Sequence, residues 1–152
     1  MKYFLYETCK EFQTLKNEVS HIKDYIDIEK LRYDETLDVS FSISGKTKKI
    51  IVKPLMLIPL VENAFKHGAR NSTKNGYIKI DLKATKKLLD FRVENSFEKQ
   101  TKKIKGQIGG IGLTNLKKIL TLNYGADFYS LDVIEEKNKY IAQLKVKLWS
   151  AV

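Results

Sequence analysis

The stretch PLMLIPLVENAFKHG, residues 54–68, brings four polar side chains of different chemistry close together. Glu62 and Lys66 are four residues apart. Asn63 and His67 repeat that spacing, so all four side chains share one stripe if the segment is a helix. A carboxylate, a carboxamide, an ammonium group and an imidazole on one stripe can hold a divalent cation and phosphate oxygens together. An ordinary amphipathic helix with a surface ion pair is the alternative, and the spacing leaves both interpretations open.

A second candidate is GGIGLTNLKKIL, residues 109–120, in which glycines lead into an expected helix. Main-chain N–H groups at such a helix start form a ready site for an anion. The segment matches neither G-x-G-x-x-G after a strand nor G-x-x-x-x-G-K-[ST], which argues against a dinucleotide site and a P-loop. A glycine hinge ahead of a helix is the alternative interpretation.

Both candidates need elements that position them. The spacing predicts a helix over residues 54–68 that begins at Pro54, where a missing N–H costs little. The face of this helix opposite the polar stripe is apolar and carries Leu57, Leu60, Val61, Ala64 and Phe65. The segment FRVENSF, residues 91–97, is expected to be a strand that ends in polar residues beside a long loop, residues 95–112. Loops of that length tend to be functional lids or binding segments.

A helix is also predicted over residues 8–32, because apolar residues recur there at spacings of three and four. These apolar residues are Phe12, Leu15, Val19, Ile22 and Ile26. Charged residues, Glu18 among them, are expected to fill the other face. A helix with such a seam needs a partner, either the body of the domain or another helix, so we expect a domain cut out of a longer protein.

Alternating apolar residues predict strands over residues 37–43, 77–82, 89–93, 128–134 and 140–148, with a short strand over 49–52. The strands over 77–82 and 89–93 are expected to form an antiparallel hairpin, and a second helix is expected over residues 112–122. Strands joined by hairpins, with two helices packed on one face, predict an α+β fold built as a two-layer sandwich and preceded by one amphipathic helix.

Composition sets the limits of this interpretation. The 152 residues fit one domain, and the 43% of hydrophobic residues favour a globular fold. One cysteine, Cys9, suits a reducing compartment, and no apolar run approaches the roughly 18 residues of a membrane span, so we expect a soluble, cytoplasmic chain. The net charge of +10 would attract nucleic acid, acidic lipid, nucleotide phosphates or an acidic protein, although a solvated lysine-rich surface is the simpler explanation.

The order of these pieces resembles the Bergerat, or GHKL, ATP-binding fold, whose N box, G1 box and G2 box follow one another in that sequence. More specifically, PLMLIPLVENAFKHG and GGIGLTNLKKIL resemble the catalytic domain of LytS-type sensor histidine kinases. The pattern ELxxIxxYIxIExxR, to which residues 16–41 are similar with Val19 in place of the leucine, extends the resemblance upstream. The resemblance implies that residues 1–33 are the last helix of a dimerisation region with its linker, and residues 34–152 the ATP-binding domain.

The resemblance also implies roles for single residues. Asn63 matches the N-box asparagine that coordinates Mg²⁺, with Glu62 beside it supporting the hydration shell of the metal. Asn95 lies where the G1 aspartate reads the adenine amino group, and Glu94 takes that place if the register slips by one residue. The implied catalytic residues are Glu62, Asn63 and Lys66, and the implied nucleotide contacts are Asn63, Lys66, His67, Asn95, Gly109, Gly110, Ile111, Gly112 and Leu113.

The chain departs from the family pattern in four places, one of which is Ile119, where a basic residue is usual late in the G2 helix. The G1 box reads Asn95-Ser96-Phe97, without the usual aspartate and glycine. The glutamate that activates water in GHKL ATPases is replaced by Pro59, which favours phosphoryl transfer over hydrolysis. The histidine box that accepts the phosphoryl group is absent, and His21, which has no acidic neighbour in sequence, is not that acceptor.

The function implied is that of the catalytic domain of a two-component sensor histidine kinase. Such a domain binds ATP and Mg²⁺ and transfers the γ-phosphoryl group to a histidine upstream of this sequence. The partners implied are a response regulator receiver domain and a second copy of the full-length protein, which is expected to be anchored in the cytoplasmic membrane, with no nucleic acid and no membrane contact for this segment. A degenerate, non-catalytic GHKL interaction domain and a basic nucleic-acid-binding module are the alternatives.

Overall fold

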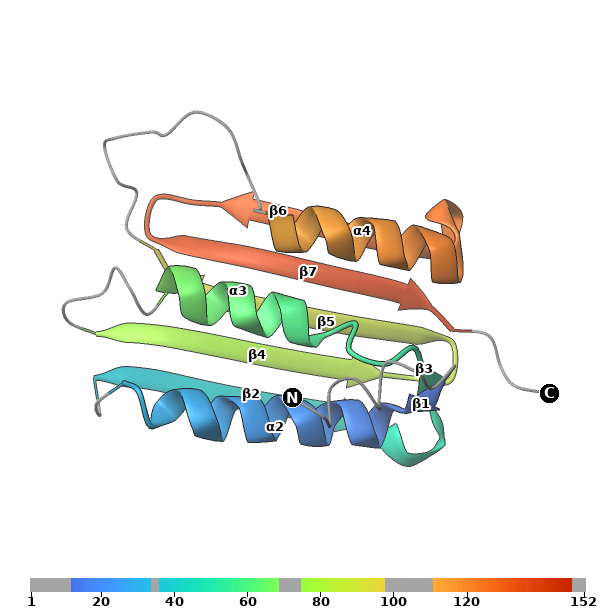
Figure 1. Cartoon of the computed structure of the whole chain (residues 1–152), viewed down its shortest axis with the longest axis horizontal. Helices are drawn as coiled ribbons and strands as arrows, with labels where there is room; N and C mark the ends of the chain where they lie inside the picture. Colours follow the sequence, from blue (N-terminus) through green and yellow to red (C-terminus); the bar gives the residue numbers. More distant parts are fainter. Residues whose placement is uncertain (1–11, 34–35, 69–74, 98–110, 149–152) are drawn as a thin grey trace.

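A five-stranded mixed sheet forms one layer of the computed structural model, which describes residues 12–33, 36–68, 75–97 and 111–148 (Figure 1). In spatial order the strands are β2 (Leu37–Gly45), β4 (Gly76–Ala84), β5 (Leu88–Ser96), β7 (Lys139–Lys147) and β6 (Tyr129–Glu135). The β2–β4 pair is parallel, and the other three pairs are antiparallel. The predicted hairpin is confirmed as β4–β5, in which Ile80 lies opposite Val93.

Three helices form the second layer and cover one face of this sheet (Figure 1). They are α2 (Leu15–Lys30), α3 (Ile58–Gly68) and α4 (Ile111–Tyr124). Helix α3 lies between the other two, over β4 and β5. The predicted α+β, two-layer fold class is therefore confirmed, with α2 as a third helix in the same layer. None of the helices in the described parts of the chain is long and apolar enough to cross a membrane.

The core lies between the two layers, and α3 contributes its most buried face. The apolar residues predicted for that face are all buried: Leu57, Leu60, Val61, Ala64 and Phe65. Phe65 packs edge-on against Tyr25 at 5.7 Å between ring centroids and stacks with Tyr33 at 6.2 Å. Burying a ring of this size contributes roughly 1.5–3 kcal/mol, so α3 is firmly fixed to the sheet.

The predicted start of the helix at Pro54 is wrong, because α3 begins at Ile58. Residues 54–57 form turns and bends instead, and Leu55 has a φ of 57°, a left-handed conformation that ends any helical path. Pro59 therefore fills the role assigned to Pro54, because it lies in the first turn where a missing N–H is tolerated.

The predicted helix over residues 8–32 is shorter in the structure, and its residues 8–11 lie outside the described part of the chain. Thr14 caps α2, since its hydroxyl oxygen accepts a hydrogen bond from the N–H of Asn17 at 3.3 Å. Residues Gln13–Thr14 form strand β1, which pairs with β3 (Ile51–Val52) in a separate two-stranded sheet. Phe12 is 51% exposed and not part of the buried seam.

Other boundaries differ from the predictions by small amounts. Short 3₁₀ helices occupy Thr47–Lys49 and Ala126–Phe128. Strand β2 continues to Gly45, whose φ of 107° and close approach to the Ala84 carbonyl oxygen require a glycine. The predicted loop over residues 95–112 begins later, because β5 includes Asn95 and Ser96, and residues 98–110 lie outside the described chain.

Candidate functional site

The end of α3 meets the first residues of β7, and several of the predicted site residues gather there. Asn63 and His67 lie on the side of α3 that faces Tyr140. The ring centroids of His67 and Tyr140 are 6.2 Å apart. The ring centroid of Phe97 is also 6.2 Å from that of Tyr140. Burial raises the pKa of the Tyr140 hydroxyl, and the nearby carboxamide of Asn63 partly offsets that rise.

Asn95 lies next to this group, because it is paired with Tyr140 across the β5–β7 ladder. It is 1% exposed and faces the helices, and its Nδ2 donates a hydrogen bond to the Ser96 carbonyl at 2.8 Å. A Cβ atom on Gly68 would come within 2.9 Å of the Asn95 Cβ. The glycine at the end of α3 therefore lets the helix approach the Asn95 side chain directly.

Asn95 and Glu94 lie on opposite faces of the sheet. Adjacent residues of a strand point to opposite faces, so Glu94 faces away from the helices. There it accepts hydrogen bonds from the Tyr77 hydroxyl at 2.9 Å and from Arg92 at 2.7 Å. Burial raises the pKa of Glu94, but these two donors outweigh burial and leave it below its usual value. Asn95 is thus the one of the two whose side chain faces the helices.

Three buried polar atoms of this cluster have no hydrogen-bond partner of ordinary geometry in the described residues. They are Nδ2 of Asn63, Oδ1 of Asn95 and the hydroxyl of Tyr140. Buried polar groups in native proteins are nearly always hydrogen-bonded, and each exception requires an explanation. These three atoms come from α3, β5 and β7, and Asn63 and Asn95 each lie beside Tyr140, so one polar ligand is the simplest explanation. We call Asn63, Asn95 and Tyr140 the polar cluster.

The other predicted polar residues of α3 lie on different sides of it. Glu62 lies towards α2: its pKa is raised by burial and then by the neighbouring Glu29. Lys66 is exposed and forms no ion pair with Glu62 within the described structure. The expected surface pair is therefore not formed.

The glycine-rich candidate lies at the start of α4, and the described chain includes only part of it. Gly109 and Gly110 lie outside the described residues, as does the side chain of Ile111, whose backbone begins the helix. A Cβ atom on Gly112 would meet no described atom within 4 Å, so this position has open space in front of it. The side chain of Leu113 is 4% exposed, so a ligand could reach this residue only through its main chain.

Two residues that the sequence did not single out hold the start of α3. Glu18 of α2 was expected on a solvated face, but it is completely buried and accepts hydrogen bonds at 2.9 Å from the N–H groups of Leu55 and Leu57. Burial raises the pKa of Glu18, and the two main-chain donors limit that rise. Tyr124, the last residue of α4, accepts a hydrogen bond from the N–H of Lys53 at 3.0 Å.

A signal for Glu18 was present in the sequence. Glu18 is three residues after Leu15 and four before Ile22, the helical spacing of the buried seam. Glu29 also lies on that stripe and is 8% exposed. Tyr140 gave no such signal, because only the strand register brings it opposite Asn95.

No group of three or more His, Cys, Asp or Glu residues that could hold a metal ion occurs in the part of the chain that the structure describes. A site for Mg²⁺ would therefore depend on Asn63 together with ligand oxygens and water. That donor set suits Mg²⁺, which keeps several waters and commonly takes few protein ligands alongside phosphates.

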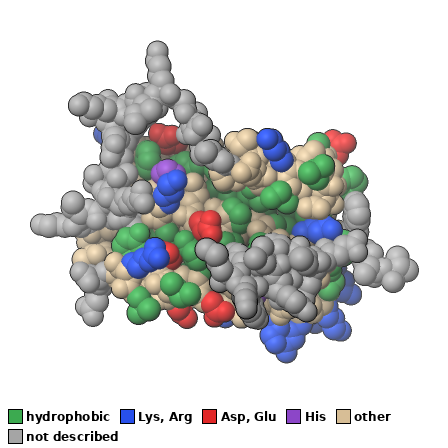
Figure 2. Space-filling model, viewed as in Figure 1, with side chains coloured by type: hydrophobic (Ala, Val, Ile, Leu, Met, Phe, Trp, Pro, Cys, Tyr) green, Lys and Arg blue, Asp and Glu red, His purple; other side chains and the backbone are tan. Residues whose placement is uncertain are grey.

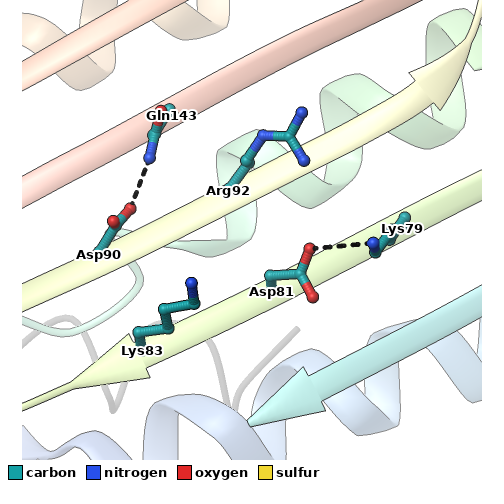
Figure 3. A pocket seen from close by; sticks show the side chains of 6 residues that line it. All are labelled: Lys79, Asp81, Lys83, Asp90, Arg92 and Gln143. Carbon is teal, nitrogen blue, oxygen red and sulfur yellow. Dashed lines mark hydrogen bonds and ion pairs between the residues drawn. The ribbon is translucent and has the colours of Figure 1, made fainter. Parts of the chain in front are cut away.

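The uncovered face of the sheet has a concavity of about 330 Å³ (Figure 3). It is lined by Lys79, Asp81, Lys83, Asp90, Arg92 and Gln143. Opposite charges face each other across the strands there, with Lys83 opposite Asp90 and Asp81 opposite Arg92. Such cross-strand pairs stabilise a solvated sheet face and point to no specific ligand.

Charge on the helical face is mixed. Figure 2 shows lysine and arginine side chains in several separate places on this face, between acidic and apolar side chains. A basic surface for nucleic acid needs these side chains clustered on one face or along one helix. The net charge of +10 is thus not gathered over the visible helical face into one basic field.

Comparisons with known proteins agree with this geometry. The chain is 28% identical over 132 residues to the sensor histidine kinase YesM of Bacillus subtilis strain 168, which is 86% of this chain and 23% of YesM. It is 26% identical over 83 residues to the sensor protein LytS of Staphylococcus epidermidis strain RP62A, which is 55% of this chain and 14% of LytS. The chain thus spans less than a quarter of the length of these relatives. No family model matches it.

Among solved structures, a nucleotide-free catalytic domain of the histidine kinase ThkA aligns with a TM-score of 0.66 at 19% identity, over 91% of this chain and 98% of that domain. The chain is a relative of the sensor histidine kinases and has the fold of their catalytic domain. The resemblance to LytS-type kinases is thereby confirmed. ThkA in complex with the response regulator protein TrrA aligns with a TM-score of 0.60 at 16% identity, over 98% of this chain and 46% of that one.

Proposed function

We propose that this chain is the ATP-binding catalytic domain of a two-component sensor histidine kinase. It binds Mg-ATP and positions the γ-phosphoryl group for transfer to a histidine outside residues 1–152. The observation that carries the proposal is the polar cluster, whose three buried polar atoms lie beside α3 and lack partners in the described residues. A nucleotide supplies the donors and acceptors that these atoms lack.

Each member of the polar cluster has a role that fits its chemistry. Oδ1 of Asn95 accepts a hydrogen bond from the amino group of the base, since its Nδ2 is already committed to the Ser96 carbonyl. The hydroxyl of Tyr140 is a further contact to the nucleotide. The unpartnered Nδ2 of Asn63 donates to a nucleotide oxygen, and its carboxamide oxygen would hold Mg²⁺, which supplies neutralisation of the phosphate charge when bound.

The remaining predicted residues form the phosphate end of the site. Lys66 and His67, on the last turn of α3, provide positive charge and hydrogen-bond donors. Glu62 supports the water around the metal. Backbone groups at the start of α4, residues 111–113, lie against the triphosphate, and the open space in front of Gly112 suits that role.

Transfer to a protein histidine is favoured over hydrolysis by the residue one helical turn before Asn63. That residue is Pro59, whose side chain offers no base to activate a water molecule. Phosphoryl transfer depends mainly on positioning and charge neutralisation, which this site can supply. A response regulator receiver domain is the proposed recipient of the phosphoryl group, and the full-length protein is proposed to be a homodimer anchored in the cytoplasmic membrane.

A thermal-shift experiment with Mg-ATP tests the proposal. The parent chain should gain several degrees in Tm, because a ligand present at 100 times its Kd stabilises the folded state by about 2.7 kcal/mol. Asn63→Ala should lose that gain while keeping the Tm of the free protein within a few degrees. Asn17→Ala, which removes an asparagine from the exposed side of α2, is the matched control and should keep the full gain. A parent chain with no gain at millimolar Mg-ATP contradicts the proposal.

A non-catalytic GHKL domain is a second candidate, favoured by the uncharged Asn95 in place of an aspartate and by the ring of Phe97 beside Tyr140. In that case the polar cluster would be a remnant, and neither ATP nor ADP would stabilise the chain. Asn95→Asp then separates the two candidates. It should strengthen nucleotide binding in a functional site and leave the Tm gain at zero in a remnant.

A further inference from the structure

Helix α3 begins without a side-chain cap from its own sequence. Residues 54–57, Pro-Leu-Met-Leu, contain none of the Ser, Thr, Asp or Asn residues that normally accept hydrogen bonds from a helix start. Residues 53–57, here called the lead-in segment, nevertheless carry N–H groups that are part-buried or buried. These groups find their acceptors on the two neighbouring helices.

Glu18 of α2 is the main acceptor. Its Oε1 accepts from the N–H of Leu57 and its Oε2 from the N–H of Leu55, both at 2.9 Å. The side-chain amide of Gln13 donates a third hydrogen bond to Oε2. Three donors thus converge on one buried carboxylate, and no described acceptor competes for them.

The lead-in segment is held in a conformation that it would not adopt alone. Leu55 has a φ of 57°, which is unfavourable for a residue with a Cβ atom, and the N–H of this residue is one of the two bound by Glu18. On the other side, the hydroxyl of Tyr124 accepts from Lys53 and donates to the sulfur of Met56 at 3.5 Å. The segment is therefore fixed between α2 and α4.

We propose that Glu18 is a positioning residue that ties α2 to the start of α3 and thereby sets where Asn63 stands in the nucleotide site. Asn63 follows Leu57 by six residues, roughly 9 Å along a rigid helix, so a displacement of the lead-in segment moves Asn63 with it. The inference rests on the proposed function for the nucleotide, while the link between α2 and α3 rests on the contacts of Glu18 alone. A change in the position of α2 reaches the nucleotide site by this route.

Glu18→Gln tests the link with little change in shape. A glutamine places an NH₂ group where one carboxylate oxygen accepted, so at least one converging donor loses its acceptor. Ile22→Val is the matched control on the same buried stripe of α2, because it removes one methyl group and no hydrogen bond. Mg-ATP affinity is measured by calorimetry at a temperature where every variant is fully folded.

We expect Glu18→Gln to weaken Mg-ATP binding at least tenfold and Ile22→Val to leave it within twofold of the parent. Amide chemical shifts recorded without nucleotide provide a second readout. Glu18→Gln should move resonances along α3 as far as Asn63 and Lys66, and Ile22→Val should leave those residues in place. Glu18→Asp, which keeps the charge but shortens its reach, replaces Glu18→Gln if the latter does not fold.

Two outcomes would overturn the inference. One is an unchanged Mg-ATP affinity in a folded Glu18 variant, and the other is a set of shift changes confined to the lead-in segment. If the parent chain binds no nucleotide, the proposed function fails by itself. The amide chemical shifts, which are recorded without nucleotide, still test the link between α2 and α3 if that happens.

Discussion

At the start of α3, both carboxylate oxygens of Glu18 and the hydroxyl of Tyr124 have main-chain donors, and the buried Oε1 of the neighbouring Gln13 is the one atom there without a partner in the described residues. Beside the middle and the end of the same helix, Asn63, Asn95 and Tyr140 each keep one buried polar atom without a partner in the described residues. Leaving such an atom unpaired costs about 1–3 kcal/mol, so the unpaired atoms of the polar cluster reduce the stability of the free protein. The hydrogen bonds of Glu18 and Tyr124 increase it.

This contrast separates residues that build the structure from residues that await a ligand. A satisfied group should affect stability when it is removed, with or without nucleotide. An unsatisfied group should affect nucleotide binding and leave the free protein as stable as before. Five substitutions test this distinction, from the largest expected effect to the smallest.

Gly68→Ala is expected to overpack the contact between the end of α3 and Asn95. The new Cβ would lie 2.9 Å from the Cβ of Asn95, so either the helix end or the strand must move. We expect a loss of about 1–3 kcal/mol in the free energy of unfolding, measured with urea, together with weaker Mg-ATP binding. An alanine tolerated without loss in either measurement would show that the close approach of Gly68 to Asn95 is unimportant.

Tyr124→Phe removes the satisfied hydroxyl and leaves the N–H of Lys53 without its acceptor. The free energy of unfolding should fall by about 1–2 kcal/mol. The loss should be equal with and without Mg-ATP if Tyr124 acts on structure alone. A stability equal to that of the parent would mean that water replaces the hydroxyl, and the contrast between the helix ends would weaken.

Gly112→Ala should separate stability from binding at the start of α4. Its Cβ meets no described atom, and alanine favours a helix by up to about 1 kcal/mol over glycine, so the free protein should be as stable or more stable. The same methyl group would occupy the space proposed for the triphosphate and weaken Mg-ATP binding. Equal affinity in calorimetry would remove Gly112 from the site.

Tyr140→Phe is the counterpart of Tyr124→Phe at the ligand end. It deletes an unpaired hydroxyl, so the free energy of unfolding should stay within about 0.5 kcal/mol of the parent or rise. Mg-ATP affinity should fall by roughly fivefold to tenfold, the equivalent of one hydrogen bond. A clear loss of stability without any loss of affinity would reverse the roles assigned to the two tyrosines.

Glu94→Gln serves as a control on the outer face of the sheet and should not change Mg-ATP affinity. The pKa of Glu94 is lowered in the folded state, so its contribution to stability is present above its ordinary value of 4.5 and is lost as the pH falls below it. The variant should therefore be slightly less stable than the parent at pH 7, by less than about 1 kcal/mol, and equal to it in strong acid. Urea titrations at both pH values check this, and a difference that grows in acid would contradict the assigned direction.

The periodicity of apolar residues was sufficient to predict the features that depend on a single segment of the sequence. The apolar face of α3, the β4–β5 hairpin and the α+β class follow from spacings within one segment, and all are confirmed. The predicted start of α3 was wrong because the turn before the helix depends on Glu18. This residue lies 37 and 39 residues before Leu55 and Leu57, whose N–H groups it binds. No local pattern contains such a contact.

The candidate site divides in the same way. Asn63 was predicted from its residue type and spacing and Asn95 from the family resemblance, and in the structure each lies beside Tyr140. Tyr140 was missed because its contact with that place arises from strand pairing. Glu18 was misplaced because a glutamate was assumed to be solvated, although its spacing matched the buried seam. A charged residue at an apolar position of a helix was the most informative signal overlooked.

The parallel pairing of β2 with β4 has a consequence for how the site is assembled. The chain between these strands, residues 46–75, includes α3 and crosses over the sheet before β4 can pair. Closing a loop of that length precedes any gain from the parallel ladder, and such long-range pairing is slow compared with the formation of a local hairpin. The hairpins β4–β5 and β6–β7 are local, so they should form early in folding, and the helix that carries Asn63 should dock late.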